Sequence, residues 1–272
     1  MHRVIFEMKE PPKECEVAHR AWEWWTTATE EEKAVAHRQM DEKNEEFIES
    51  ECKRLLTPKT WKKSLWPAGR EIRFCFRDWD YTLQTDHETA KAVACQAKAL
   101  SDKIIAGSTD NAAFIGGTGC GKTSLAIAIL TACRKQSMPC MVLSTAELVS
   151  SLDSSYGYDD ARRQISKVEQ AAVDCSVLLL DDLGVEGGPQ IKPVRRDMAQ
   201  MMYRISNARL DKATLVTTNN TPAELGRMYD ERIVSRLIPK NKGQIVDMRG
   251  LDDVRGKRKR RNGNDYYRSS KF

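Results

Sequence analysis

The stretch GGTGCGKT, residues 116–123, combines residue types and spacing that can bind phosphate groups. Gly116 is followed by four residues and then by Gly121, Lys122 and Thr123, which completes the phosphate-loop pattern. Glycines let successive backbone N–H groups point into one concavity, and such a concavity binds anionic oxygens. We expect Lys122 to reach the outer phosphates and the Thr123 hydroxyl to ligate magnesium. The stretch therefore predicts a site for a nucleoside triphosphate.

The segments on either side of this loop have the character that the motif needs. Residues 112–115 form a short apolar run typical of a buried strand, and residues 124–133 favour a helix. A helix beginning near Gly121 would add the positive end of its dipole to the phosphate site. A glycine-rich loop alone can be an ordinary turn, but the strand and helix favour the nucleotide interpretation. The candidate binding residues are Gly116, Gly117, Thr118, Gly119, Cys120, Gly121, Lys122, Thr123 and Ser124.

A second stretch supplies carboxylates. Residues 177–180 are fully apolar and are followed by Asp181 and Asp182. A buried strand that delivers a carboxylate beside a phosphate loop can hold magnesium, and the next acid can polarise an attacking water. A solvated acidic turn is the alternative, and the upstream phosphate loop makes it less favoured.

Further strands and helices alternate around these motifs. Residues 140–143 are expected to be a strand. A further strand is expected to begin at residues 215–216 and to end in the polar run at 217–220, which contains Asn219. Helix starts are indicated where Ser, Thr and Glu stand at capping-box spacing, at Thr85/Glu88, Ser144/Glu147 and Thr221/Glu224. Alternating strands and helices predict an α/β fold with a parallel sheet, whose ligands bind at the carboxyl ends of the strands.

Charge is distributed unevenly along the chain. Residues 1–52 hold seven basic and fourteen acidic side chains, residues 53–73 seven basic and one acidic, and residues 256–272 again seven and one. Such asymmetry suggests that each end meets a different kind of partner. The expected division is a helical partner-binding module at 1–72, a linker at 73–84, a nucleotide-binding domain at 85–255 and a basic tail at 256–272.

The first module is expected to contain two helices. Apolar positions recur at helical spacing before Thr29, and Thr29 with Glu32 forms a capping box for a second helix. This helix is predicted to run to Leu56, because Pro58 forces it to stop. The tryptophans of the module either fill a small core or form a patch for a partner.

The eight cysteines show no CxxC pair, which favours reduced thiols in a reducing compartment. A zinc site made by Cys15, His19, His37 and Cys52 is an alternative, although its spacing matches no familiar metal pattern. No apolar run is long enough to span a bilayer, and the charged start does not resemble a signal peptide. We therefore expect a cytoplasmic protein with no membrane partner.

Five features stand in order along the chain: GGTGCGKT, LLLDDLG, TTNN, ERIVSRL and DDVR. Together they resemble the AAA+ ATPases, and within them the DnaC-type replicative helicase loaders and their IstB-type transposition relatives. The resemblance covers about residues 73–255. It implies a P-loop NTPase sheet of the ASCE class sandwiched by helices, an ATP and Mg²⁺ site, and ATP hydrolysis.

The resemblance also implies a role for each matching residue. Lys122 would bind the β and γ phosphates, while Thr123 and Asp181 would hold Mg²⁺. Asp182 would orient the lytic water, and Asn219 would sense the γ-phosphate. Most AAA+ proteins place Glu where this chain has Asp182. The shorter side chain predicts slow hydrolysis, which suits a switch better than a motor.

Three arginines have expected places in the same scheme. Arg236 matches the arginine that reaches a neighbouring subunit's nucleotide, so self-association is implied. Arg232 precedes it and is expected only to pair with an acid, whereas Arg255 stands where a second, weaker sensor is expected. Without the other motifs, Arg236 would read as a surface ion pair. Too few residues follow Arg236 for the helical lid of most AAA+ proteins.

Partners follow from the same resemblance. The leading hypothesis is an ATP-dependent loader that grips a replicative helicase through residues 1–72 and binds single-stranded DNA. The alternatives are an IstB-type transposase helper acting on duplex DNA, and a nucleotide-gated scaffold with little turnover. Tyrosines and cations in residues 256–272 could bind single strands, or that tail is merely solubilising.

Cys120 stands inside the phosphate loop at a helix N-terminus, where the pKa of a thiol tends to fall. This position predicts that alkylation of Cys120 blocks ATP binding and that bound ATP protects the thiol.

Overall fold

The computed structural model describes residues 16–155, 158–188 and 190–257. Its contacts divide the chain into two compact units, Met1–Cys52 and Lys53–Phe272. Residues 258–272, which make up most of the basic tail predicted at 256–272, lie outside the described residues.

The smaller unit contains helix α1 (Glu16–Thr27) and the first part of helix α2 (Glu30–Lys62). The predicted capping box is confirmed: the Thr29 N–H donates to Glu32 Oε2 at 2.8 Å, and the Glu32 N–H donates to Thr29 Oγ1 at 3.2 Å. Trp25 packs edge-on against His37, with ring centroids 5.1 Å apart. Trp24 is half exposed and Phe47 is mostly exposed.

The zinc alternative finds no support in the described part of the chain. Cys15 and the side chain of His19 lie outside what the structure describes. Cys52 is exposed, and His37 contacts Trp25. Among the described residues, no group of three His, Cys, Asp or Glu side chains is placed to hold a metal ion.

The prediction that Pro58 ends the second helix is wrong, because α2 continues through Pro58 to Lys62. Thr57 and Trp61 are buried in the larger unit. Thr57 Oγ1 lies 2.7 Å from the carbonyl oxygen of Ser137, and the Arg134 guanidinium carbon lies 3.8 Å from the centre of the Trp61 ring. These contacts offset the cost of a proline inside a helix, which is about 3 kcal/mol.

The division by contacts therefore falls after Cys52 rather than after the predicted residue 72. One contact that places residues after Cys52 in the larger unit is made by Leu65. It forms an isolated parallel β-bridge with Leu143 of the edge strand β2. Trp66 packs edge-on against Trp61 at 4.9 Å. Residues 53–72 are thus a structural part of the larger unit, and a partner-binding role for 1–72 stays a prediction.

The larger unit is built on a five-stranded sheet in the order β2-β3-β4-β1-β5, with every described pair parallel. Four strands fall where the sequence predicts them, and they are β1 (Ala112–Ile115), β2 (Cys140–Ser144), β3 (Val177–Asp181) and β4 (Thr214–Thr218). Strand β5 (Ile245–Asp247) is not among the predicted strands; it is three residues long and pairs with β1.

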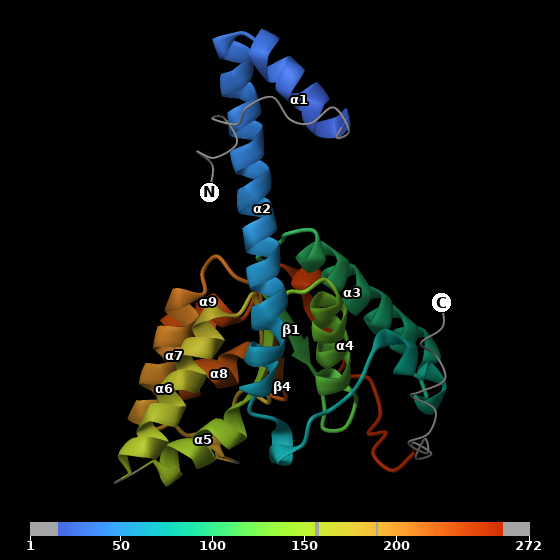
Figure 1. Ribbon diagram of the computed structural model, residues 1–272. Coiled ribbons are helices and arrows are strands. Elements are labelled where there is room, and N and C mark those ends of the chain that lie inside the picture. Colours follow the sequence, from blue (N-terminus) through green and yellow to red (C-terminus); the bar gives the residue numbers. More distant parts are fainter. Residues whose placement is uncertain (1–15, 156–157, 189, 258–272) are drawn as a thin grey trace. The chain divides into compact units, whose positions relative to one another are not determined.

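Helices cover both faces of this sheet (Figure 1). In β1, Phe114 joins a core with helices α3 and α4, whereas Ile115 joins a second core with α5 to α9. Leu179 and Leu180 of β3 divide in the same way, as the two-residue repeat of a strand requires. The helices are α3 (His87–Ile105), α4 (Lys122–Lys135), α5 (Thr145–Ser154), α6 (Asp159–Asp174), α7 (Arg196–Ala208), α8 (Pro222–Met228) and α9 (Glu231–Leu237).

Of the three capping signals predicted in the larger unit, two are confirmed and one is wrong. Ser144 accepts a hydrogen bond from the Glu147 N–H, and Thr221 forms the full capping box with Glu224. Helix α3, however, is capped by Asp86, one residue after the predicted Thr85. The N–H and hydroxyl of Thr85 instead donate hydrogen bonds to Oδ2 of Asp252, which is distant in the sequence. A tertiary contact thus replaces the local cap.

The described residues contain no helix long and apolar enough to cross a membrane. The described residues 238–257 hold only a short 3-10 turn and β5, and this stretch contains no helical lid.

Candidate nucleotide-binding site

The phosphate loop connects the end of β1 to the start of α4. Gly119 and Gly121 have φ angles of 76° and 101°, in the left-handed region that favours glycine. A Cβ atom at Gly121 would lie 2.6 Å from a ring carbon of Trp79, and one at Gly119 would lie 1.8 Å from Asp253 Oδ1. The backbone conformation therefore favours glycine at both positions, and at Gly121 the Trp79 ring leaves no room for a side chain.

Lys122 is buried at the first position of α4. Its Nζ donates hydrogen bonds to the carbonyl oxygens of Gly116 at 3.1 Å and Gly117 at 2.7 Å, and to Asn219 Oδ1 at 2.6 Å. The ammonium group thus lies against the loop and joins it to the residue that follows β4. A cation at this place can meet the outer phosphates of a nucleotide held by the loop.

Asp181, the last residue of β3, is almost fully buried. Its Oδ1 accepts hydrogen bonds from Thr123 Oγ1 at 2.8 Å and Thr217 Oγ1 at 2.7 Å. Burial raises the pKa of this carboxyl group to about 6, and the charge of Asp182 acts in the same direction. The two hydroxyl groups and Lys122 lower the pKa by less.

The second oxygen of Asp181, Oδ2, is buried and has no hydrogen-bond partner among the described residues. An unpartnered buried carboxylate oxygen is costly and marks a place for a ligand or an ordered water. The donor set of a carboxylate and a threonine hydroxyl fits Mg²⁺, which binds through one or two carboxylates and keeps several waters. Asp181 and Thr123 would hold this ion, which when bound neutralises charge on the phosphates.

Asp182 lies at the mouth of the same site. Its backbone has a φ of 56°, its N–H donates to Thr217 Oγ1 at 2.8 Å, and its carbonyl accepts from Thr145 Oγ1 at 2.9 Å. A left-handed backbone is tolerated by aspartate and turns the chain sharply at the strand end. The half-buried side chain is thereby directed into a cavity instead of continuing the strand alternation.

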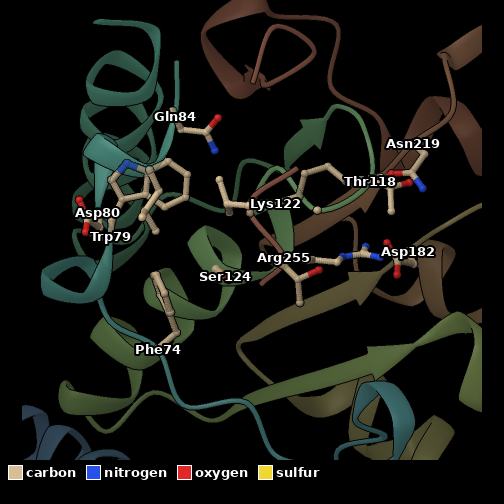
Figure 2. Close-up of a pocket in the computed structure, with 15 residues that line it drawn as sticks. Phe74, Trp79, Asp80, Gln84, Thr118, Lys122, Ser124, Asp182, Asn219 and Arg255 are labelled. Carbon is tan, nitrogen blue, oxygen red and sulfur yellow. Dashed lines mark hydrogen bonds between the residues drawn. The ribbon is translucent and has the colours of Figure 1, made fainter. Parts of the chain in front are cut away.

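This cavity has a volume of about 320 Å³ and opens above the phosphate loop. Figure 2 shows Phe74 and Trp79 across it from Asp182 and Asn219, with Lys122 between them. From the predicted set, the cavity is lined by Thr118, Gly119, Gly121, Lys122, Thr123, Ser124, Asp182, Asn219 and Arg255. Residues from four separate chain segments therefore meet in one place.

The wall opposite the acids comes from the segment predicted to be a linker. It consists of Phe74, Trp79, Asp80, Leu83 and Gln84. Trp79 is held in place because its Nε1 donates to the carbonyl of Ala90 at 3.0 Å. The sequence does show the aromatic character of residues 73–84, but nothing local indicates that they line the site.

The DDVR motif closes the remaining side. The Asp252 N–H donates to Gln84 Oε1 at 2.6 Å, and Asp252 Oδ2 accepts from the N–H and hydroxyl of Thr85. The Val254 N–H donates to the Gly119 carbonyl at 3.2 Å, and Arg255 lines the cavity. This short segment thus joins the aromatic wall to the phosphate loop.

Five predicted site residues do not line the cavity, and they are Gly116, Gly117, Cys120, Asp181 and Arg236. Arg236 lies on α9, away from the cavity of its own chain. Cys120 is fully buried, and its Sγ donates to the Gly117 carbonyl at 3.1 Å. Gly116 packs against the Met248 backbone, so a Cβ there would lie 2.9 Å from it.

The prediction of a low pKa for Cys120 is wrong. Burial raises the pKa of this thiol, and the positive charge of Lys122 opposes that effect only in part. A fully buried, neutral thiol is a poor nucleophile, so Cys120 is not a reactive group of the loop.

A parallel sheet in which β4 separates the phosphate-loop strand from the acid-bearing strand, with these residues at its carboxyl edge, defines a P-loop nucleotide-binding protein of the AAA+ type. The chain belongs to the family of IstB-like ATP binding proteins, whose model matches residues 16–258. The predicted resemblance to DnaC- and IstB-type AAA+ ATPases is confirmed at this level.

Two curated relatives are similar over part of their length. The chain is 26% identical over 131 residues to a protein of insertion sequence IS21 from Pseudomonas aeruginosa that is named for ATP binding, covering 48% of this chain and 46% of that one. It is 29% identical over 154 residues to the uncharacterised protein YdaV of Escherichia coli K12, covering 57% and 59%. The chain thus spans about half the length of these relatives.

Two solved structures are similar to part of this chain. The AMPPCP-bound DnaA of Aquifex aeolicus has a TM-score of 0.50 at 18% identity, covering 65% of this chain and 50% of that one. A DnaC helicase loader has a TM-score of 0.48 at 20% identity, covering 63% and 97%.

We predict that Cys120 resists alkylation in the folded protein. Because Cys52 and Cys95 are exposed, a maleimide reagent should label them within minutes while Cys120 reacts only after unfolding. Peptide mass spectrometry of the labelled chain measures all three sites together. Labelling of Cys120 as fast as Cys95 in the native protein would contradict the buried position.

We predict that Asp181 makes stability depend on pH. Its folded pKa of about 6 lies above the ordinary 3.8. Between these two pH values the native state therefore holds a proton that the unfolded chain has lost. The free energy of unfolding should therefore fall as the pH rises from about 4 to 6, by up to about 3 kcal/mol. Denaturant titrations of the metal-free protein and its Asp181→Asn variant measure this. Equal pH dependence in both proteins would contradict the assignment.

Proposed function

We propose that this protein is an Mg²⁺-dependent ATPase whose nucleotide state controls its assembly on DNA. The observation that carries the proposal is the contact set at the sheet edge, where Lys122, Asn219, Thr123 and Asp181 are joined by hydrogen bonds around one cavity. These groups supply a cation for phosphates, a carboxylate and hydroxyl for Mg²⁺, and an amide near the γ-phosphate.

Slow hydrolysis follows from Asp182. Its side chain lines the cavity and would orient the lytic water, but it is one methylene shorter than glutamate. ATP would then remain bound long enough to stabilise an assembly, and hydrolysis would release it. Arg236, which lies outside its own chain's cavity, would act on the nucleotide of a neighbouring copy.

Two partner classes remain for the assembled protein. A replicative helicase loaded onto single-stranded DNA is the first, with the module at 1–72 as the gripping element. Trp24, Phe47 and Ile48 offer exposed apolar side chains in the described part of that module. A transposase and duplex DNA are the second, favoured by the IstB-like family and the IS21 relative.

Two substitutions test the ATPase. Lys122→Ala should weaken ATP binding by about tenfold or more, since charge-assisted hydrogen bonds to phosphate contribute about 1.5–3 kcal/mol. Asp182→Asn should keep binding but lower turnover by roughly 10²–10⁴-fold, because it removes the group that orients water. Fluorescent-nucleotide titration and phosphate release measure the two steps separately. Equal turnover in wild type and Asp182→Asn would favour the nucleotide-gated scaffold instead.

A binding experiment with the full-length chain separates the two partner classes. With ATP present, a loader should capture a hexameric replicative helicase and prefer a single-stranded oligonucleotide in fluorescence anisotropy. A transposition helper should prefer duplex DNA of equal length and capture a transposase. In either case the Lys122→Ala variant, as matched control, should lose the ATP dependence. ATP-independent binding of every ligand would contradict the proposed switch.

A further inference from the structure

A tyrosine on α7 lies against two arginines of α9. Tyr203 is exposed at the surface, with 36% of its area accessible. The guanidinium carbons of Arg232 and Arg236 lie 5.6 and 5.2 Å from the centre of its ring. Both distances are within the range of a cation–π interaction, and the two arginines stand one helical turn apart.

The two guanidinium groups differ in what neutralises them. Arg232 forms a forked pair with Asp230, with Nε–Oδ1 at 2.9 Å and Nη2–Oδ2 at 3.1 Å. This pair lowers the pKa of Asp230 to about 2. The prediction that Arg232 pairs with an acid is therefore confirmed. No residue in the described part of the chain forms an ion pair with Arg236, and its Nη1 atom is buried without a hydrogen-bond partner there.

The backbone that carries Arg236 is also fixed. Asn111 Nδ2 donates to the Arg236 carbonyl at 2.5 Å, while Asn111 Oδ1 accepts from the Thr214 N–H at 2.8 Å. One amide side chain thus joins the end of α9 to the start of β4. With its main chain held in this way, the orientation of Arg236 depends on what its side chain touches.

An aromatic ring and a carboxylate orient a guanidinium with opposite consequences. A carboxylate uses the N–H donors and cancels the charge, as Asp230 does for Arg232. The face of Tyr203 attracts the cation through its ring and uses none of the N–H donors of Arg236. Holding the side chain in advance also reduces the rotamer entropy that is lost on binding.

We propose that Tyr203 is a positioning residue for Arg236, holding its guanidinium ready for the nucleotide of a neighbouring copy. The inference rests on the proposed function, in which Arg236 acts between subunits. It goes further by assigning the orientation of that arginine to an aromatic side chain on α7.

The first test measures ATP turnover of full-length variants under assembling conditions. Tyr203→Ala should lower turnover by about 2- to 30-fold, whereas Tyr203→Phe, which keeps the ring, should stay within about twofold. ATP affinity and the melting temperature should change little, because the side chain is partly exposed and does not line the cavity of its own chain. Arg204→Ala, from the same helix and paired with Glu169, is the control and should leave turnover unchanged. Equal losses in the Ala and Phe variants would overturn the role of the ring.

A double-mutant comparison then tests whether Tyr203 acts through Arg236. In the Arg236→Ala background, Tyr203→Ala should cause no further loss. An undiminished loss in that background would show that Tyr203 acts by another route and would overturn the inference.

Mixing experiments separate failure of this inference from failure of the proposed function. The Lys122→Ala variant should bind its own nucleotide weakly but can supply Arg236 to a neighbour, so mixing it with Arg236→Ala should restore turnover. Mixing it with Tyr203→Ala should restore turnover as well. Recovery with Arg236→Ala but not with Tyr203→Ala would overturn the positioning role alone. Recovery with neither would overturn the action of Arg236 between subunits, and this inference with it.

Discussion

The burial of Asp181 is the constraint on which the rest of the site depends. A carboxylate at the end of a central parallel strand is removed from water, and burial alone would favour its neutral form. Two threonine hydroxyls satisfy one oxygen, and they come from different elements, α4 and β4. The hydrogen bonds therefore hold helix α4, strand β3 and strand β4 in one arrangement. The second oxygen is left for a ligand outside the protein.

The aromatic wall of the cavity packs against the phosphate loop and limits which residues the loop can contain. Trp79 covers Gly121 so closely that no side chain fits there, and the Ala90 carbonyl fixes the indole through its N–H. The segment around Asp252 then bridges from the wall to the loop. In the absence of a helical lid among the described residues after α9, these two segments enclose the nucleotide cavity. A nucleotide bound there would contact elements from both ends of the larger unit.

On the surface formed by α7 and α9, the contacts of two arginine side chains decide how each guanidinium group is oriented. Arg232 is paired with an acid beside it, whereas Arg236 is held by a ring and by its anchored backbone. A cation that is oriented by a ring, and that forms no ion pair within the described part of the chain, is suited to meet an anion supplied from outside.

The sequence by itself determined the phosphate loop, the paired aspartates and four of the strands. Each depends on local patterns, namely glycine spacing, an apolar run of strand length and the residues that directly follow it. Capping at Ser144 and Thr221 is local for the same reason. The sequence also identified the family resemblance, because its motifs retain their order and identity along the chain.

Only the tertiary structure decided the features in which distant segments compete with local preference. Pro58 does not end α2, because burial of Thr57 and Trp61 outweighs the lost hydrogen bond. Thr85 does not cap α3, because Asp252 binds it, and Cys120 is not activated, because burial outweighs the helix terminus. The aromatic wall and the pairing of Tyr203 with Arg236 join residues far apart in the chain. Spacing in a sequence reports neighbours along the backbone, whereas burial and pairing depend on which faces the fold brings together.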